Sequence, residues 1–82
     1  MYNIVQLERT CIACPSQWEG ELDTGQSVYI RFRHGQLTID IDDTCVLSIV
    51  CSDRLDGSMS NEALISLTKA KFNYMCDIND IE

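Results

Sequence analysis

Two cysteines separated by two residues are the first candidates for chemistry in this sequence. Cys11 and Cys14 form a C-x-x-C pair, a spacing found in half of many zinc sites and in thioredoxin-like redox motifs. A zinc site needs two further ligands, and the remaining cysteines form no second C-x-x-C pair. A thioredoxin-like pair would begin a helix after a strand, whereas the residues after Pro15 alternate as in a sheet. We expect buried apolar cysteines without metal or cofactor, and keep a zinc- or thiol-dependent module as an alternative.

His34 is the only histidine in the chain, so it alone titrates close to neutral pH. A histidine can act as the base for a cysteine or serine nucleophile. His34 stands beside Gly35 at the expected tip of a hairpin, where no pocket is implied. Asp42 and Asp43 do not fit the ligand spacing of an EF-hand loop, and we expect them in a solvated loop. The sequence therefore predicts a protein that is not an enzyme.

Net charge restricts the class of partner. Thirteen acidic and six basic side chains give a formal charge of -7, which repels phosphate backbones and anionic lipid surfaces. We expect no direct contact with nucleic acid or membrane, and a protein partner with a basic surface instead. No apolar run reaches the roughly 18 residues that a membrane span needs, and residues 1–7 lack the features of a secretion signal. An odd number of cysteines, five, indicates free thiols, so we expect a cytoplasmic protein.

The side chains between positions 17 and 51 alternate between apolar and polar, which predicts antiparallel strands with one wet face. His34 and Gly35 can close a two-residue hairpin, since glycine accepts the positive φ that tight turns require. This register brings apolar residues together at three positions, and a slip of one residue would turn all of them over. The predicted pairs are Phe32 with Leu37, Ile30 with Ile39, and Val28 with Ile41.

The remaining elements complete a single domain over residues 1–82. Residues 45–51 keep the apolar parity only if Asp42-Asp43-Thr44 forms a three-residue or bulged connection. Ser60 is the expected N-cap of a helix that begins at Asn61 or Glu62. Its apolar stripe would comprise Leu64, Ile65, Thr68, Phe72 and Met75. We predict an α+β fold, an antiparallel meander of about four strands with one C-terminal helix packed on one face. Residues 2–7 are a candidate for a further strand.

Cross-strand neighbours on the wet face decide whether its charges compensate one another. A loop over residues 23–27 would place Glu19 opposite Arg31 and Gln17 opposite Arg33. Such pairs would give a surface whose charges cancel locally. The alternative is that exposed Tyr and Arg side chains anchor a partner, because these residue types dominate interface hot spots.

Carboxylates displayed along a sheet can mimic the negative charges of a nucleic-acid backbone, and can thereby bind the basic surface of a nucleic-acid-binding protein. The leading prediction is a non-catalytic acidic binding protein that presents carboxylates to a basic surface. The predicted partner-binding residues are Glu19, Glu21, Tyr29, Arg31, Arg33, Asp40, Asp42 and Asp43. A small structural or regulatory subunit that forms a homodimer through an edge containing Val46 and Val50 is an alternative.

A pattern in the first half of the chain resembles small, uncharacterised bacterial and phage-borne proteins. It consists of Cys14-Pro-Ser-Gln-Trp-Glu-Gly, then Gly25, then Tyr29-Ile-Arg-Phe-Arg-His-Gly-Gln-Leu. In size and acidity the chain is also similar to phage-encoded inhibitors of host defence, including anti-CRISPR and anti-restriction proteins. That resemblance implies an inhibitor of a host nucleic-acid-binding complex, acting in the host cell cytoplasm, and assigns no site residues.

Overall fold

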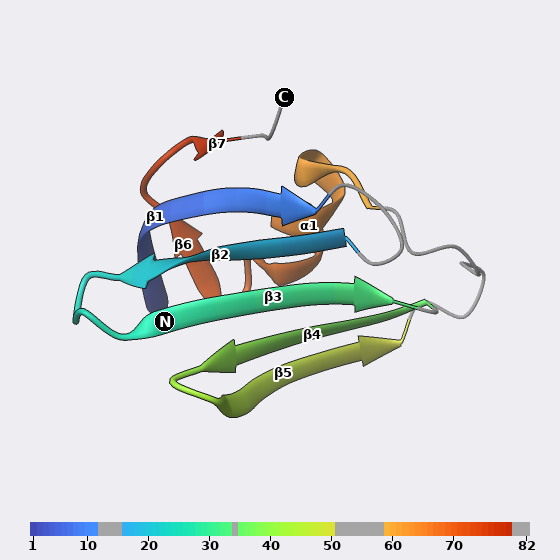
Figure 1. The fold of residues 1–82 in the computed structure, drawn as a ribbon, viewed down its shortest axis with the longest axis horizontal. Coiled ribbons are helices and arrows are strands. Elements are labelled where there is room, and N and C mark those ends of the chain that lie inside the picture. Colours follow the sequence, from blue (N-terminus) through green and yellow to red (C-terminus); the bar gives the residue numbers. More distant parts are fainter. Residues whose placement is uncertain (12–15, 34, 51–58, 80–82) are drawn as a thin grey trace.

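The computed structural model describes residues 1–11, 16–33, 35–50 and 59–79. Within them the elements are β1 (Tyr2–Cys11), β2 (Ser16–Leu22), β3 (Ser27–Arg33), β4 (Gln36–Ile41), β5 (Thr44–Val50), α1 (Asn61–Thr68), β6 (Phe72–Tyr74) and β7 (Ile78–Asn79). The strands form one curled sheet in the order β5-β4-β3-β2-β1-β6, with β7 also paired to β1 (Figure 1). β1 to β5 pair antiparallel, whereas β6 and β7 run parallel to β1.

The predicted fold class is therefore wrong. In the described residues the chain is mostly strand, with a mixed sheet of seven strands curled into a half-barrel and a single short helix. A four-stranded antiparallel meander under a long C-terminal helix does not describe it. The difference arises at the two ends of the chain, where β1, β6 and β7 join the sheet.

The hairpin between β3 and β4 has the predicted register. Phe32 pairs with Leu37 and Ile30 with Ile39. Two residues connect the strands, and Gly35 has a φ of 76°, in the region that favours glycine. Strict alternation and a glycine at the turn were sufficient to predict this part of the fold.

A bulge is present as predicted, but it lies inside β5 at Val46 rather than in the connection, so Cys45, which pairs with Asp40, does not share the apolar parity of Leu47. Asp42 and Asp43 form a two-residue turn with φ angles of 49° and 69°, a left-handed conformation that aspartate tolerates better than most residues. Thr44, expected in the loop, instead begins β5. Val46 has no partner in the β4 ladder, and this extra residue restores the apolar parity of Leu47.

β1 carries irregularities that hide it from a simple alternation rule. Ile4 and Leu7 are both completely buried although they are three positions apart, an odd spacing that regular alternation would place on opposite faces, because the ladder with β2 shifts at Val5. Gly20 pairs with Leu7 next to this shift, and a Cβ added to Gly20 would lie 1.9 Å from the carbonyl oxygen of Gln6. Close approach of the two backbones at the bend of β1 therefore requires a glycine.

The helix begins as predicted and ends early. The Ser60 hydroxyl accepts a hydrogen bond from the backbone N–H of Ala63 at 3.1 Å, which satisfies one donor of the first turn. α1 ends at Thr68, and Phe72, assigned above to the helical stripe, belongs instead to β6. Met75 is 60% exposed and contributes nothing to the core. The predicted stripe is wrong at Ile65, which is 37% exposed, and it is wrong beyond Thr68 because the chain there returns to the sheet beside β1.

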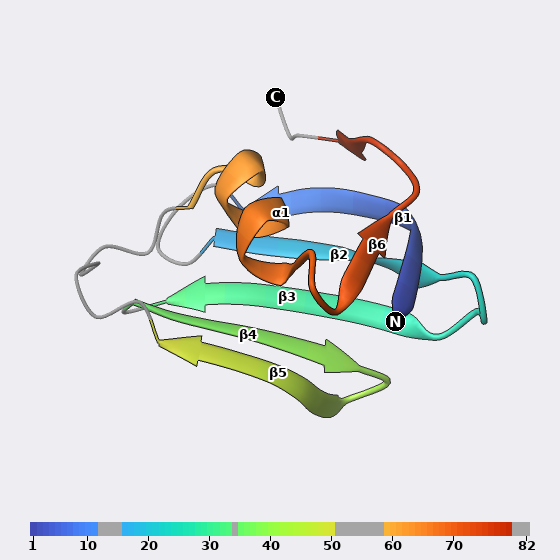
Figure 2. The same cartoon turned by 180° about the vertical axis from the view of Figure 1, so that it is seen from behind.

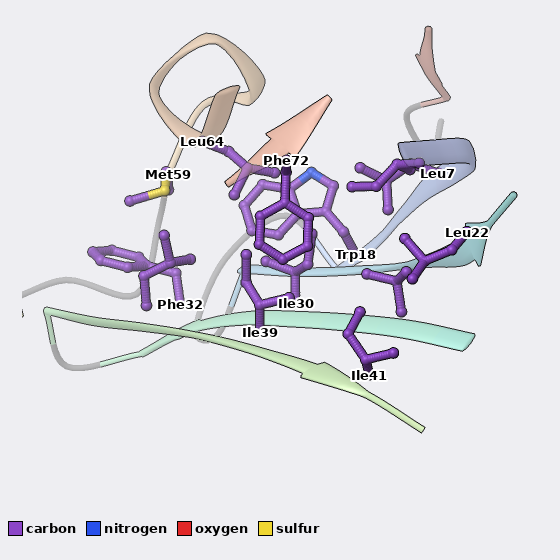
Figure 3. Close-up of a cluster of buried hydrophobic side chains, with 13 residues drawn as sticks. Leu7, Trp18, Leu22, Ile30, Phe32, Ile39, Ile41, Met59, Leu64 and Phe72 are labelled. Atoms are coloured by element: carbon purple, nitrogen blue, oxygen red, sulfur yellow. The ribbon is translucent and has the colours of Figure 1, made fainter. Parts of the chain in front are cut away.

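One hydrophobic core fills the concave face of the sheet. α1 and β6 lie across β2 and β3 on this side (Figure 2). Trp18, Phe32 and Phe72 are the largest fully buried side chains, and Phe72 belongs to the same buried cluster as Trp18, Ile30 and Leu64 (Figure 3). The core residues are Ile4, Leu7, Trp18, Leu22, Val28, Ile30, Phe32, Leu37, Ile39, Ile41, Met59, Leu64 and Phe72. The opposite face, called here the outer face, is free of α1 and β6.

Candidate functional site

The outer face gathers most of the residues that the sequence nominates for binding. In β2, β3 and β4 buried and more exposed residues alternate, so the side chains between the core positions point to the outer face. Those side chains include Glu19, Glu21, Tyr29, Arg31, Arg33 and Asp40. Asp42 and Asp43 lie apart from them, in the β4–β5 turn at one end of the sheet.

Three carboxylates form one row across four neighbouring strands. Glu8 pairs with Glu19, Glu19 pairs with Tyr29, and Tyr29 pairs with Asp40. We call Glu8, Glu19 and Asp40 the acidic row. Residues directly opposite on antiparallel strands have Cβ atoms about 5 Å apart, so Glu8 and Glu19 are close neighbours of like charge. Within the described residues, no carboxylate of this row forms an ion pair.

The predicted pairing of Glu19 with Arg31 and of Gln17 with Arg33 is wrong. Arg31 pairs with Gln17 on one side and with Thr38 on the other, so both of its direct neighbours are uncharged. The register differs by two residues from the expected one. The outer face is therefore not a surface on which opposite charges face each other.

A tighter turn explains this shift. Leu22 donates its backbone N–H to the carbonyl of Gln26 at 2.9 Å, and Gly25 donates back to Leu22 at 3.0 Å. Gly25 has a φ of 88°, which is typical of the left-handed residue that completes a three-residue hairpin loop. The loop is therefore shorter than the predicted 23–27 segment, and each residue of β2 pairs with a residue of β3 two positions earlier in the chain than predicted.

The carboxylate of Asp42 is engaged within the fold. Its Oδ1 accepts from the backbone N–H of Ser27 at 3.0 Å and from the Ser27 hydroxyl at 3.2 Å. The backbone hydrogen bond from Ser27 is the main reason that the pKa of Asp42 is lowered, with Gln26 and the Ser27 hydroxyl acting in the same direction against desolvation. Asp42 thus ties the β4–β5 turn to the start of β3, whereas Asp43 is exposed.

Two arginines line a hollow on the same outer face, beside the acidic row. Arg31, Arg33, Gln36 and Thr38 surround a space of about 310 Å³. Arg31 is half-buried, and its Nε is buried without a hydrogen-bond partner. The Gln36 side-chain amide donates to the Ser48 hydroxyl at 3.0 Å, which holds that side of the hollow in place.

A buried polar cluster under the start of α1 was not foreseen. The guanidinium of Arg9 donates to Asn61 Oδ1 and Ser16 Oγ, both at 3.2 Å, and to the carbonyl of Met59. It also lies 4.9 Å from the centre of the Trp18 ring, whose indole N–H donates to Asn61 at 2.9 Å. These contacts join β1 and β2 to the first residue of α1, which is a structural role. No sequence signal marks Arg9, because its place on the inner face follows from the irregular β1.

The candidates for nucleophilic or metal chemistry lie only partly within the described residues. In them no group of three His, Cys, Asp or Glu side chains could hold a metal ion. Burial raises the pKa of the Cys76 thiol, as does the nearby Asp77, against a hydrogen bond from the Leu7 backbone. Cys14 and His34 lie outside the described residues, so the zinc- or thiol-dependent alternative remains a prediction.

Comparison with protein-family models, with curated proteins and with solved structures found no match. Across the described ranges, no helix has both the length and the apolar character needed to cross a membrane.

Proposed function

We propose that this chain is a non-catalytic binding protein whose outer face presents carboxylates to a basic surface of a protein partner. The observation that carries the proposal is the Glu8–Glu19 pair, two exposed carboxylates directly opposite each other across β1 and β2. Such a pair weakens the fold by up to about 1 kcal/mol. A cationic partner would relieve that repulsion.

The surroundings of this pair support the same partner chemistry. Glu21 and Asp40 lie on the same face, and the exposed carboxylate of Asp43 lies at the turn end of the strands. Tyr29, between Glu19 and Asp40, is half-buried and offers an aromatic ring to a partner in the middle of the row. A surface that grips nucleic acid is itself basic. The proposal therefore includes an inhibitor that occupies such a surface on a nucleic-acid-binding complex in the cytoplasm.

The first test uses stability alone and needs no partner. Replacing Glu19 by Gln removes one charge of the opposed pair and preserves shape, so E19Q should raise the free energy of unfolding by about 0.5 kcal/mol at low salt. The gain should shrink in 0.5 M salt, because salt screens the repulsion. Urea denaturation of wild type and E19Q at both salt concentrations measures this difference in the free energy of unfolding.

The second test measures binding. Immobilised wild-type chain is incubated with extract of the source cells, captured proteins are released by a salt gradient, and their affinities are measured individually. The double variant E8Q/E19Q should bind a captured basic partner at least about tenfold more weakly than wild type. The matched control is E62Q/D77N, which changes the net charge equally at exposed sites outside the outer face.

These tests separate the proposal from a general effect of charge. Equal weakening by E8Q/E19Q and E62Q/D77N would show that only net charge matters, and would overturn the assignment of the outer face. A double variant that gains stability and keeps full affinity would show that the acidic row is not the binding surface.

A second candidate function is a homodimeric subunit joined through β5. β5 is an edge strand of the sheet and contains no charged residue. Edge strands that stay unpaired are usually guarded by charge, proline or a cover. The exposed end of the strand is apolar, since Val50 is 72% exposed. Light scattering across a hundredfold range of protein concentration distinguishes a monomeric binding protein from a homodimeric subunit. A monomer at every concentration would rule out the dimer. If a dimer forms, V50K should dissociate it.

A further inference from the structure

We propose that the hollow lined by Arg31, Arg33, Gln36 and Thr38 is a binding site for an oxyanion, either a phosphate or a carboxylate group of a ligand. This site differs from the acidic row in the sign of the charge that it selects, and it does not rest on the proposed function. Its geometry follows from the β3–β4 hairpin, whose two-residue connection brings all four side chains to one end of the outer face.

The lining of the hollow supplies hydrogen-bond donors. Arg31 and Arg33 each carry a guanidinium with five N–H donors, which match the oxygens of a carboxylate or phosphate. Thr38, the direct neighbour of Arg31 across the strands, adds a hydroxyl, and Gln36, the neighbour of Arg33, adds an amide. No lining residue in the described part of the chain is acidic.

Arg31 lacks both a hydrogen-bond partner for its Nε–H and a charged cross-strand neighbour. Its Nε is buried and makes no hydrogen bond, although a buried N–H donor normally has a partner. Its two cross-strand neighbours, Gln17 and Thr38, carry no charge that could neutralise it. An oxyanion in the hollow would supply the missing charge and would accept hydrogen bonds from the guanidinium, for which no hydrogen bond is found within the described residues.

The carboxylates of the acidic row do not fill this role. Glu19 and Asp40 occupy positions diagonal to Arg31, within reach of a long side chain. In the described residues neither of them forms an ion pair with Arg31. The hollow of about 310 Å³ far exceeds the roughly 10 to 15 Å³ of cavity space that one water molecule needs, so an oxyanion fits together with part of its hydration shell.

The test titrates the protein with inorganic phosphate and, separately, with acetate, at ionic strength fixed with chloride. Two-dimensional NMR follows the Nε–H signals of Arg31 and Arg33. We expect a saturable shift of the Arg31 signal. Saturation by phosphate alone identifies a phosphate site, and saturation by acetate as well identifies a site for carboxylates too.

Three variants assign the binding to the hollow. R33Q removes an exposed guanidinium and should weaken anion binding at least about fivefold, followed at the Arg31 signal. R31K keeps the positive charge but lacks the Nε–H and the planar fork, and should weaken binding similarly, followed at Arg33. K69Q makes the same change in net charge as R33Q at an exposed site beyond the end of α1, and should leave binding unchanged.

Two results would overturn the site. One is a shift that grows linearly with phosphate and acetate and matches that of added chloride. The other is equal weakening by K69Q and R33Q, which would indicate a general effect of charge. R33Q decides the matter if R31K alters the fold, because Arg33 is exposed at the end of β3. Neither result bears on the acidic row, whose tests use carboxylate variants and a basic partner.

Discussion

Gly20 is a position at which the addition of a single methyl group should disrupt the curled sheet. It lies in β2 opposite Leu7, at the bend of β1. A Cβ at this position would lie 1.9 Å from the carbonyl oxygen of Gln6, 2.8 Å from its carbonyl carbon and 2.9 Å from the Cα of Leu7. All three atoms belong to the backbone, so no side-chain rotation can relieve the contact. Gly20→Ala can be accommodated only if β1 and β2 separate locally.

The expected loss of stability is about 3 kcal/mol. Overpacking in a well-packed interior costs about 1 to 3 kcal/mol, and each ladder hydrogen bond that lengthens or breaks adds about 1 kcal/mol. Replacing glycine by alanine also restricts the unfolded chain, which offsets about 0.5 to 1 kcal/mol of this loss. For a domain of this size, 3 kcal/mol corresponds to a fall in Tm of about 15 °C.

The matched control is Gly25→Ala in the β2–β3 turn. Gly25 has a φ of 88°, but nothing lies within 4 Å of an added Cβ. Left-handed strain alone costs roughly 1 kcal/mol. Thermal and urea unfolding of both variants should therefore rank G20A well below G25A. If G20A were as stable as G25A or more stable, the close approach of β1 to β2 and the account of the curl would be refuted.

Two further predictions concern the polar contacts that hold the ends of α1. Asn61→Ala removes the acceptor shared by Trp18 and Arg9, so it should lower the urea-unfolding free energy by about 2 kcal/mol, and a change below about 0.5 kcal/mol would contradict that role. Burial raises the pKa of Tyr74 above its usual value, despite the hydrogen bond with Thr68. Because the folded pKa exceeds the unfolded value near 10, this stabilising contribution is complete below about pH 10 and is lost as pH rises through the folded pKa. The stability difference between wild type and Tyr74→Phe should therefore fall above pH 10, and a constant difference from pH 8 to 11.5 would contradict this reasoning.

The sequence predicts the β3–β4 hairpin well because every local signal there agrees. The strands alternate without interruption, Gly35 accepts the positive φ of the turn, and the apolar pairs match only in one parity. The N-cap at Ser60 is predictable for the same kind of reason, since its hydroxyl acts within three residues of its own position. Local chemistry is sufficient at these sites.

The sequence marks residues 2–7 only as a candidate strand, which β1 confirms, and it does not reveal β6 and β7 or the pairing of β1, because these depend on distant contacts. The shift at Val5 breaks the alternation of β1, and Phe72 fits an apolar helical stripe as well as it fits a short strand. What selects the strand is contact with β1, where Phe72 stacks on Tyr2 with ring centres 5.1 Å apart. Contacts across some seventy residues leave no periodic trace in the sequence.

The charge pattern of the outer face shows why the register could not be inferred from the core. Side chains alternate with a period of two, so a shift of two residues between β2 and β3 keeps every apolar residue on the inner face. The free energy gained from burying the core therefore differs little between the actual register and the predicted one. The predicted register would have paired Glu19 with Arg31.

The turn between β2 and β3, rather than the core, selects the register of these two strands. A three-residue loop closed by Gly25 fixes the pairing of β2 with β3, whereas a surface ion pair contributes only about 0.2 to 1 kcal/mol. The same turn therefore places Tyr29 rather than Arg31 beside Glu19, and places the neutral Gln17 beside Arg31. One turn closed by Gly25 therefore accounts for a feature of each candidate site, because no arginine lies opposite Glu19 and no carboxylate lies opposite Arg31 between β2 and β3.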